Sequence, residues 1–212
     1  MQIKKIGHCC LVIKDQGLTV LTDPGAFSTG QNDLTGIDVV LITHEHQDHF
    51  HLESLKAVLA NNPGAVVVTN SAVGSLLDKE HISHEILEQG QSKTFGQVLI
   101  EAFGDIHADI FRTIEPVQNT GYLIGNKLFY PGDAFTNPAK PVEILALPVS
   151  GPWMKISEAL DYALVLKPKI VFPVHDGFLK FGGPFYSVPK MILEPKGVRF
   201  IEPDESGNVT IG

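Results

Sequence analysis

Four side chains of the metal-binding type stand within six residues of one another in the segment THEHQDHFH. They are His44, His46, Asp48 and His49. Residues two apart in an extended segment project to the same side, so His44 and His46 can present their imidazoles to one ion. Where the chain turns into a following helix, Asp48 and His49 are directed toward a second point. Imidazole nitrogen with carboxylate oxygen suits Zn²⁺, and Mn²⁺, Fe²⁺ and Ni²⁺ also accept it, so the spacing favours two transition-metal ions.

A histidine-rich segment can also be an ordinary polar loop. Here four donors gather at the end of one predicted strand, in a chain with 9 histidines in all, which favours metal binding. Three more donors, which follow other predicted strands at the edge where α/β sheets bind ligands, are His107, Asp133 and His175. A turn or a satisfied polar residue explains each of them alone, but together they supply the three ligands that two ions still require.

Buried strands and short helices are predicted to carry these donors. A helix that begins at Leu52 is stopped by the segment NNPG, and a second helix, over 71–79, is capped by Ser71. The pair Gly125-Asn126 predicts a hairpin within 120–133, and 93–103 is expected to form a strand or a hairpin. The remaining elements are a helix over 156–167 and strands over 2–13, 17–22, 37–42, 65–69, 144–149, 170–175, 198–203 and 208–211. Because no linker interrupts them, residues 1–212 are expected to form one domain.

The composition excludes several classes of protein. The chain has 212 residues, of which 43% are hydrophobic, and a net charge of −8. This balance is globular and offers no basic face, so nucleic acid is not an expected partner. No segment approaches about 18 consecutive apolar residues and the first apolar run is too short for a secretion signal, so a cytoplasmic protein without membrane association is expected. The adjacent Cys9 and Cys10 are interpreted as reduced strand residues.

The segment HEHQDH matches the HxHxDH signature of the metallo-β-lactamase superfamily, and the later donors His107, Asp133 and His175 follow in that family's order. The chain resembles this superfamily over nearly its whole length. The resemblance implies an α/β (α+β) fold, a four-layer αββα sandwich of two mixed β-sheets flanked by helices. The segments IGHCCLVI and LTDPG resemble its small metal-dependent hydrolase branch, which includes L-ascorbate-6-phosphate lactonase-like proteins.

The resemblance also implies two divalent transition-metal ions, with zinc expected first and manganese, iron or nickel as alternatives. In the implied ligand set, one ion is bound by His44, His46 and His107, the other by Asp48, His49 and His175, and Asp133 bridges the two. The pattern HxHxDH, in place of HxExDH, favours the hydrolytic branch over the di-iron branch that reduces oxygen and nitric oxide. An iron-containing oxidoreductase on the same fold and a metal-binding module without turnover remain as alternatives.

A binuclear metal-dependent hydrolase is the leading functional hypothesis. Water held between two cations has its pKa lowered from 15.7 toward ~7, so a bridging hydroxide can cleave an ester, phosphoester or lactone bond. Asp48 or Asp133 is expected to accept the proton of that water. Two divalent ions, two carboxylates and one hydroxide leave about one positive charge, which favours a small anionic metabolite as substrate. The oligomeric state is left open, a homo-oligomer included.

Other residues are candidates for supporting this centre. Asp23, at the end of a predicted strand, could accept the second ring N–H of a ligand histidine, although an Asp-Pro turn explains it equally well. His8 could line the site or be an ordinary polar residue of its strand. Trp153, Phe178 and Lys180 are expected to contact substrate from loops, while aromatic residues in loops can also cap the core.

Overall fold

The computed structural model describes residues 1–211, which form two seven-stranded β-sheets. In spatial order, the first sheet consists of β14 (Asn208–Val209), β1 (Gln2–Gly7), β2 (Cys10–Asp15), β3 (Leu18–Thr22), β4 (Val39–Leu41), β5 (Val66–Thr69) and β6 (His84–Ile86). The second sheet consists of β13 (Arg199–Phe200), β12 (Ile170–Val174), β11 (Ile144–Pro148), β10 (Leu128–Tyr130), β9 (Gly121–Ile124), β8 (Val98–Phe103) and β7 (Ser92–Phe95).

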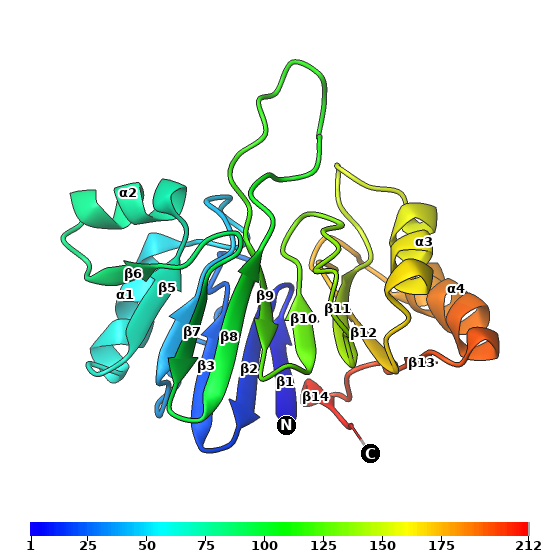
Figure 1. Cartoon of the computed structure of the whole chain (residues 1–212), viewed down its shortest axis with the longest axis horizontal. Coiled ribbons are helices and arrows are strands. Elements are labelled where there is room, and N and C mark those ends of the chain that lie inside the picture. Colours follow the sequence, from blue (N-terminus) through cyan, green and yellow to red (C-terminus); the bar gives the residue numbers. More distant parts are fainter. Residues whose placement is uncertain (212) are drawn as a thin grey trace.

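Both sheets are mixed and carry helices on their outer faces. Strands β3 to β6 and β10 to β13 pair in parallel, while β1 to β3 and β7 to β10 pair antiparallel. The helices α1 (Leu52–Asn61) and α2 (Ser71–Lys79) cover the first sheet. The second sheet is covered by α3 (Ile156–Leu166) and α4 (Gly183–Leu193), which is followed by the short helix η1 (Glu194–Lys196) (Figure 1). The predicted four-layer αββα sandwich is therefore confirmed.

Apolar side chains fill three layers, one between the sheets and one under each pair of helices. In β4, Val39 and Leu41 belong to the middle layer, whereas Val40 belongs to the layer under α1 and α2. Leu55 of α1 and Leu77 of α2 complete that outer layer. Successive residues of a strand face opposite sides, so a strand buried on both faces needs an unbroken apolar run, as the sequence has at 39–42.

The carboxyl ends of the parallel strands meet at one edge of the sandwich. The loops that follow β3 and β4 carry Asp23 and His44, and the loops that follow β10 and β12 carry Asp133 and His175. The long loop over 104–120, between β8 and β9, rises above this edge at the top of Figure 1. Both sheets therefore contribute polar loops to the same end of the molecule.

The predicted strand over 2–13 is wrong as a single element. It divides into β1 and β2 at His8 and Cys9, where Gly7 pairs with Cys10 across the reversal. His8 has φ 46°, a left-handed conformation that few non-glycine residues adopt, so the apolar pattern did not predict a turn there. His8 and Cys9 consequently lie at the edge that carries the metal-binding candidates.

Three smaller expectations also differ from the structure. The helix α2 is capped by Asn70, whose side chain accepts a hydrogen bond from Val73 N, and not by Ser71. The three-residue strand β6 was not predicted. Helix α4 was not predicted either, because Pro184 and Pro189 make its segment resemble a loop. Pro184 lies in the first turn of α4, where the missing N–H leaves no helical hydrogen bond unmade.

Among residues 1–211, no helix has both the length and the apolar character needed to cross a membrane.

Candidate metal centre

The predicted ligands lie in two adjoining groups at this edge. In the first group, the candidate ligand atoms of His44, His46, His107 and Asp133 all lie within 4.8 Å of one another. The two histidines of the HEHQDH segment follow β4 of the first sheet, whereas His107 and Asp133 follow β8 and β10 of the second. His46 is half-buried and the other three are buried. The group therefore forms only where the two sheets are packed together.

The second group surrounds His49 and His175. The Nε2 atoms of these two rings lie 3.7 and 3.4 Å from Asp48 Oδ2. Asp133 lies between the groups, with its carboxylate oxygens 3.1 Å from His49 Nε2, 2.9 Å from His175 Nε2 and 3.4 Å from His107 Nε2. The structure thus brings together all seven residues that the sequence selected, with Asp133 between the two groups.

Buried polar atoms without hydrogen bonds converge in this centre. The unpaired atoms are the Nε2 atoms of His44, His49, His107 and His175 and one oxygen, Oδ1, of Asp133. These atoms lie close together, but their geometry is not that of hydrogen bonds. Burying a polar atom without a partner costs free energy. Two ligand atoms that are each about 2.1 Å from a tetrahedral ion lie about 3.4 Å apart, which is the range observed between these nitrogens and the carboxylates. The donor set therefore fits divalent transition metals.

The other ring nitrogen of each of these four histidines is held by the protein. The Nδ1 partners are Thr43 Oγ1 for His44 (3.0 Å), Asp23 Oδ2 for His49 (2.7 Å), Ala108 O for His107 (2.6 Å) and Ser150 O for His175 (2.6 Å). A carbonyl or carboxylate oxygen can only accept, so in three of these rings Nδ1 carries the proton. This tautomer directs the Nε2 lone pair into the centre, as metal coordination requires.

Asp23 is fully buried and its carboxylate accepts four hydrogen bonds. Oδ2 accepts from His49 Nδ1 and the Thr43 hydroxyl, both at 2.7 Å, and from the Tyr130 hydroxyl at 2.5 Å. Oδ1 accepts from the Thr43 backbone N–H at 2.8 Å. The contact expected from the sequence, a carboxylate on the second nitrogen of a candidate ligand histidine, is therefore present. Gly25 makes it possible for this turn to approach the HEHQDH segment, because a Cβ atom there would lie 1.9 Å from Asp48 O.

His8 contacts Asp48 rather than facing the space between the two groups. The Gly177 backbone N–H donates to His8 Nδ1 at 2.9 Å, so the ring proton is on Nε2, which lies 3.0 Å from Asp48 Oδ2 and donates to it. Both nitrogens are then engaged, and neither has a free lone pair for an ion. This geometry makes His8 a residue that orients the Asp48 carboxylate.

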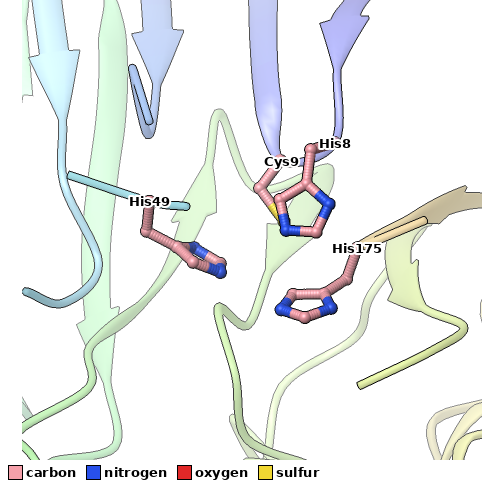
Figure 2. Close-up of side chains that lie close together, drawn as sticks. All are labelled: His8, Cys9, His49 and His175. Atoms are coloured by element: carbon pink, nitrogen blue, oxygen red, sulfur yellow. The ribbon is translucent and has the colours of Figure 1, made fainter. Parts of the chain in front are cut away.

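Cys9 is the neighbour of the centre that the sequence did not reveal. Its thiol and one ring nitrogen each of His8, His49 and His175 lie within 4.8 Å of one another, and Figure 2 shows the four side chains gathered together. Burial alone would raise the pKa of the Cys9 thiol, but His49 and His8 lower it to about 6. The adjacent Cys10 packs in the layer under α1 and α2, away from the centre. Nothing in the pattern HCC distinguishes the two thiols until the reversal at His8 is known.

The carboxylates determine the protonation of the imidazoles in the metal-free protein. Burial alone would lower the pKa of His175, but the Asp133 carboxylate raises it to about 10. The pKa of His49 is raised in the same way, whereas burial and the imidazole of His49 hold the pKa of His44 well below its usual range. The Asp133 carboxylate therefore favours the protonated form of both His49 and His175 when no cation is bound.

A cavity of about 190 Å³ opens onto the centre. It exposes His46, Asp48, His107, Asp133 and His175, and its remaining lining residues are Phe27, Gln47, Ile110, Pro152, Trp153 and Phe178. Two of the three predicted substrate contacts, Trp153 and Phe178, are thus on its wall, and Gln47 of the HEHQDH segment is there as well. Lys180 lies outside this set, and its ammonium is 5.5 Å from the centre of the Phe181 ring.

Trp153 has a second contact that the sequence did not predict. Its indole N–H donates to Asp133 Oδ2 at 2.8 Å, and its side chain is only 7% exposed. The indole also packs edge-on against the rings of His107 and His175, with 5.9 Å between ring centres in both pairs. Trp153 therefore fixes the central carboxylate as well as forming part of the cavity wall.

Comparisons with known proteins agree with this geometry. The family model of the beta-lactamase superfamily domain matches residues 2–175. Protein Rv0786c of Mycobacterium tuberculosis is 34% identical over 184 residues, which cover 84% of this chain and 85% of that protein. A UPF0173 metal-dependent hydrolase of Carboxydothermus hydrogenoformans is 27% identical over 195 residues, covering 82% of this chain and 84% of the relative.

Among solved structures, Igni18, a metallo hydrolase from Ignicoccus hospitalis, has the same fold, with a TM-score of 0.75, 18% identity and coverage of 100% of this chain and 98% of that one. The fold, the matched family model and the relatives lead to one conclusion. This chain belongs to the metallo-β-lactamase superfamily and is a metal-dependent hydrolase.

Proposed function

We propose that the protein is a binuclear hydrolase that cleaves an ester, phosphoester or lactone bond in a small metabolite that is anionic at its reacting end. The observation that supports this proposal best is the set of unpaired Nε2 atoms directed at both sides of the Asp133 carboxylate. In this proposal, His44, His46 and His107 would hold one ion, Asp48, His49 and His175 would hold the other, and Asp133 would contribute to both sites. Zinc is the expected metal.

The two ions, when bound, lower the pKa of a water between them toward ~7 and polarise the scissile bond. The side chains of this protein fix the positions of the metal-binding groups and accept the proton of the attacking water. Asp48 is fixed by His8 and its side chain is 15% exposed, against 3% for Asp133, so Asp48 is better placed to accept the proton of the attacking water. Asp133 accepts a hydrogen bond from the Trp153 N–H, which fixes its carboxylate between the two groups of candidate ligands.

Metal analysis and a substrate panel test this proposal together. Elemental analysis of the folded protein is expected to find about two equivalents of transition metal, as binuclear hydrolases require. Zinc-loaded and manganese-loaded samples are then assayed on phosphodiesters, phosphomonoesters, lactones and thioesters. A folded sample that binds less than one equivalent, or a fully loaded one that turns over none of these classes, would contradict the proposal.

Loading zinc into the chelator-treated protein at pH 7 is expected to release at least about two protons, because His49 and His175 must lose theirs to coordinate. Both pKa values are raised above the ordinary 6.5, so competition by protons is strong at acid pH and weakens as the pH rises toward 10. The apparent zinc affinity should therefore increase with pH over this range. Calorimetry in buffers of different ionisation enthalpy measures the release, and a binding heat independent of buffer would disprove it.

A further inference from the structure

The cavity wall beyond the candidate ligands is almost entirely apolar. Apart from those ligands and Gln47, its lining residues are Phe27, Ile110, Pro152, Trp153 and Phe178. They come from the loops after β3, β8, β11 and β12, so loops of both sheets supply apolar side chains to the wall. No lysine or arginine is among the lining residues in the described part of the chain. Apart from the centre itself, the wall therefore offers nothing to neutralise a charge on a substrate.

Two phenylalanine rings form the mouth of this cavity. Phe27 and Phe178 meet edge to face, with 5.1 Å between ring centres and 83° between planes. Both rings also pack against His8 at 5.1 Å, and Phe178 lies 5.3 Å from the ring of His175. Phe27 is 47% exposed and Phe178 49% exposed, so apolar surface faces water beside the polar centre. An apolar group placed there would remove this surface from water, which is favourable.

The volume restricts the size of that group. Pockets for drug-sized ligands usually measure about 300–1,000 Å³, and an apolar cavity of about 150 Å³ accommodates one benzene ring. At about 190 Å³, this cavity has room for a single ring or a short branched chain close to the centre. A second charge on the substrate, away from the ions, would be desolvated against the aromatic wall without a partner.

We infer that the substrate carries one compact, uncharged apolar group, a single ring or a short branched chain, which packs in the cavity against Phe27 and Phe178 beside its scissile bond. This inference rests on the proposed hydrolytic function, in which the reacting end of the substrate faces the ions. It narrows the substrate class to esters, phosphoesters or lactones with such a substituent. Highly charged metabolites such as sugar phosphates with several ionised groups fit this wall poorly.

Binding of two simple anions to the zinc-loaded full chain tests the inference. Methylphosphonate and phenylphosphonate present the same group to the ions and differ only in the apolar substituent. By calorimetry, phenylphosphonate is expected to bind roughly tenfold more tightly than methylphosphonate, since the ring is buried against two aromatic side chains. In Phe178→Ala this ratio should fall to about threefold or less, because half of that aromatic contact is removed.

Phe181→Ala is the matched control. Phe181 lies in the same segment, is 74% exposed and does not line the cavity, so its removal should leave the ratio unchanged. The affinity for methylphosphonate within each variant verifies that its metal centre is intact, and Phe178→Leu retains apolar bulk if the alanine variant loses that affinity.

The outcomes separate this inference from the function on which it rests. If both phosphonates bind equally well in a zinc-dependent manner, the apolar subsite is disproved and the binuclear centre stands. A ratio that is the same in wild type and in Phe178→Ala also disproves it. If neither anion binds to protein that contains two zinc ions, or if no zinc is bound, the proposed function fails and the inference fails with it.

Discussion

Asp133→Ala is expected to abolish hydrolysis, with a loss of at least about a thousandfold in kcat/KM. Asp133 lies within 3.4 Å of three candidate ligand nitrogens, so its removal leaves three buried imidazoles without the carboxylate that joins them. Bound metal ions supply several kcal/mol of transition-state stabilisation, and each ~1.4 kcal/mol lost lowers the rate about tenfold. The bound metal should fall clearly below two equivalents.

Two further variants make this experiment specific. Asp133→Asn keeps an oxygen for the Trp153 N–H but lacks the charge, so it should retain the fold and still lose most activity. His81→Asn alters an exposed histidine after α2 whose φ of 55° asparagine tolerates well, and it should behave as wild type. Equal activity and equal metal content in wild type and Asp133→Ala would refute the bridging assignment.

Asp23→Asn is expected to destabilise the protein by about 3 kcal/mol, although Asp23 does not line the cavity at the centre. In either orientation, the amide turns its NH₂ group toward a buried donor, the Thr43 N–H at one oxygen position or His49 and Tyr130 at the other, and the negative charge that these donors contact is lost. For a domain of this size, about 3 kcal/mol lowers Tm by roughly 6–12 °C. Asparagine tolerates the φ of 38° at this position, so the effect is not one of backbone strain.

Asp38→Ala provides the comparison for this variant. Its carboxylate also accepts a backbone hydrogen bond, from Thr19 N at 2.7 Å, but the residue is exposed. Loss of an exposed contact of this kind costs about 1 kcal/mol or less. Thermal unfolding of the two variants distinguishes the effect of burial from simple hydrogen-bond loss. Each 1 kcal/mol of lost stability is expected to lower Tm by roughly 2–4 °C. If the Tm of Asp23→Asn lay within about 2 °C of the Tm of Asp38→Ala, the two variants would differ by less than about 1 kcal/mol and the argument would be contradicted.

The sequence allowed the position of the main donors to be predicted because a simple rule connects them. Residues such as His44 and His175 directly follow buried strands, and parallel strands of a sheet end at one edge. The continuous apolar runs predicted buried strands, which are local in the chain, so the pattern of residue types is sufficient to predict them. The αββα layers were implied only by the resemblance that the HxHxDH segment carries.

The contacts that the sequence did not predict depend on the exact packing of distant loops. His8 meets Gly177, 169 residues away, and Trp153 meets Asp133 across the end of the second sheet. Cys9 reaches the centre only because the chain reverses at His8 with a left-handed φ. Lys180 was expected beside the substrate from its sequence neighbourhood, yet it does not line the cavity and its ammonium lies over the Phe181 ring. No periodicity encodes such arrangements.

The indole of Trp153 gives this protein a built-in optical probe. The chain contains one tryptophan, so its ultraviolet emission comes from a single known position, which donates a hydrogen bond to the central carboxylate. Any event that redistributes charge on Asp133 alters the surroundings of that fluorophore directly. The filling and emptying of the centre can therefore be followed in the unmodified protein, in real time and without a dye.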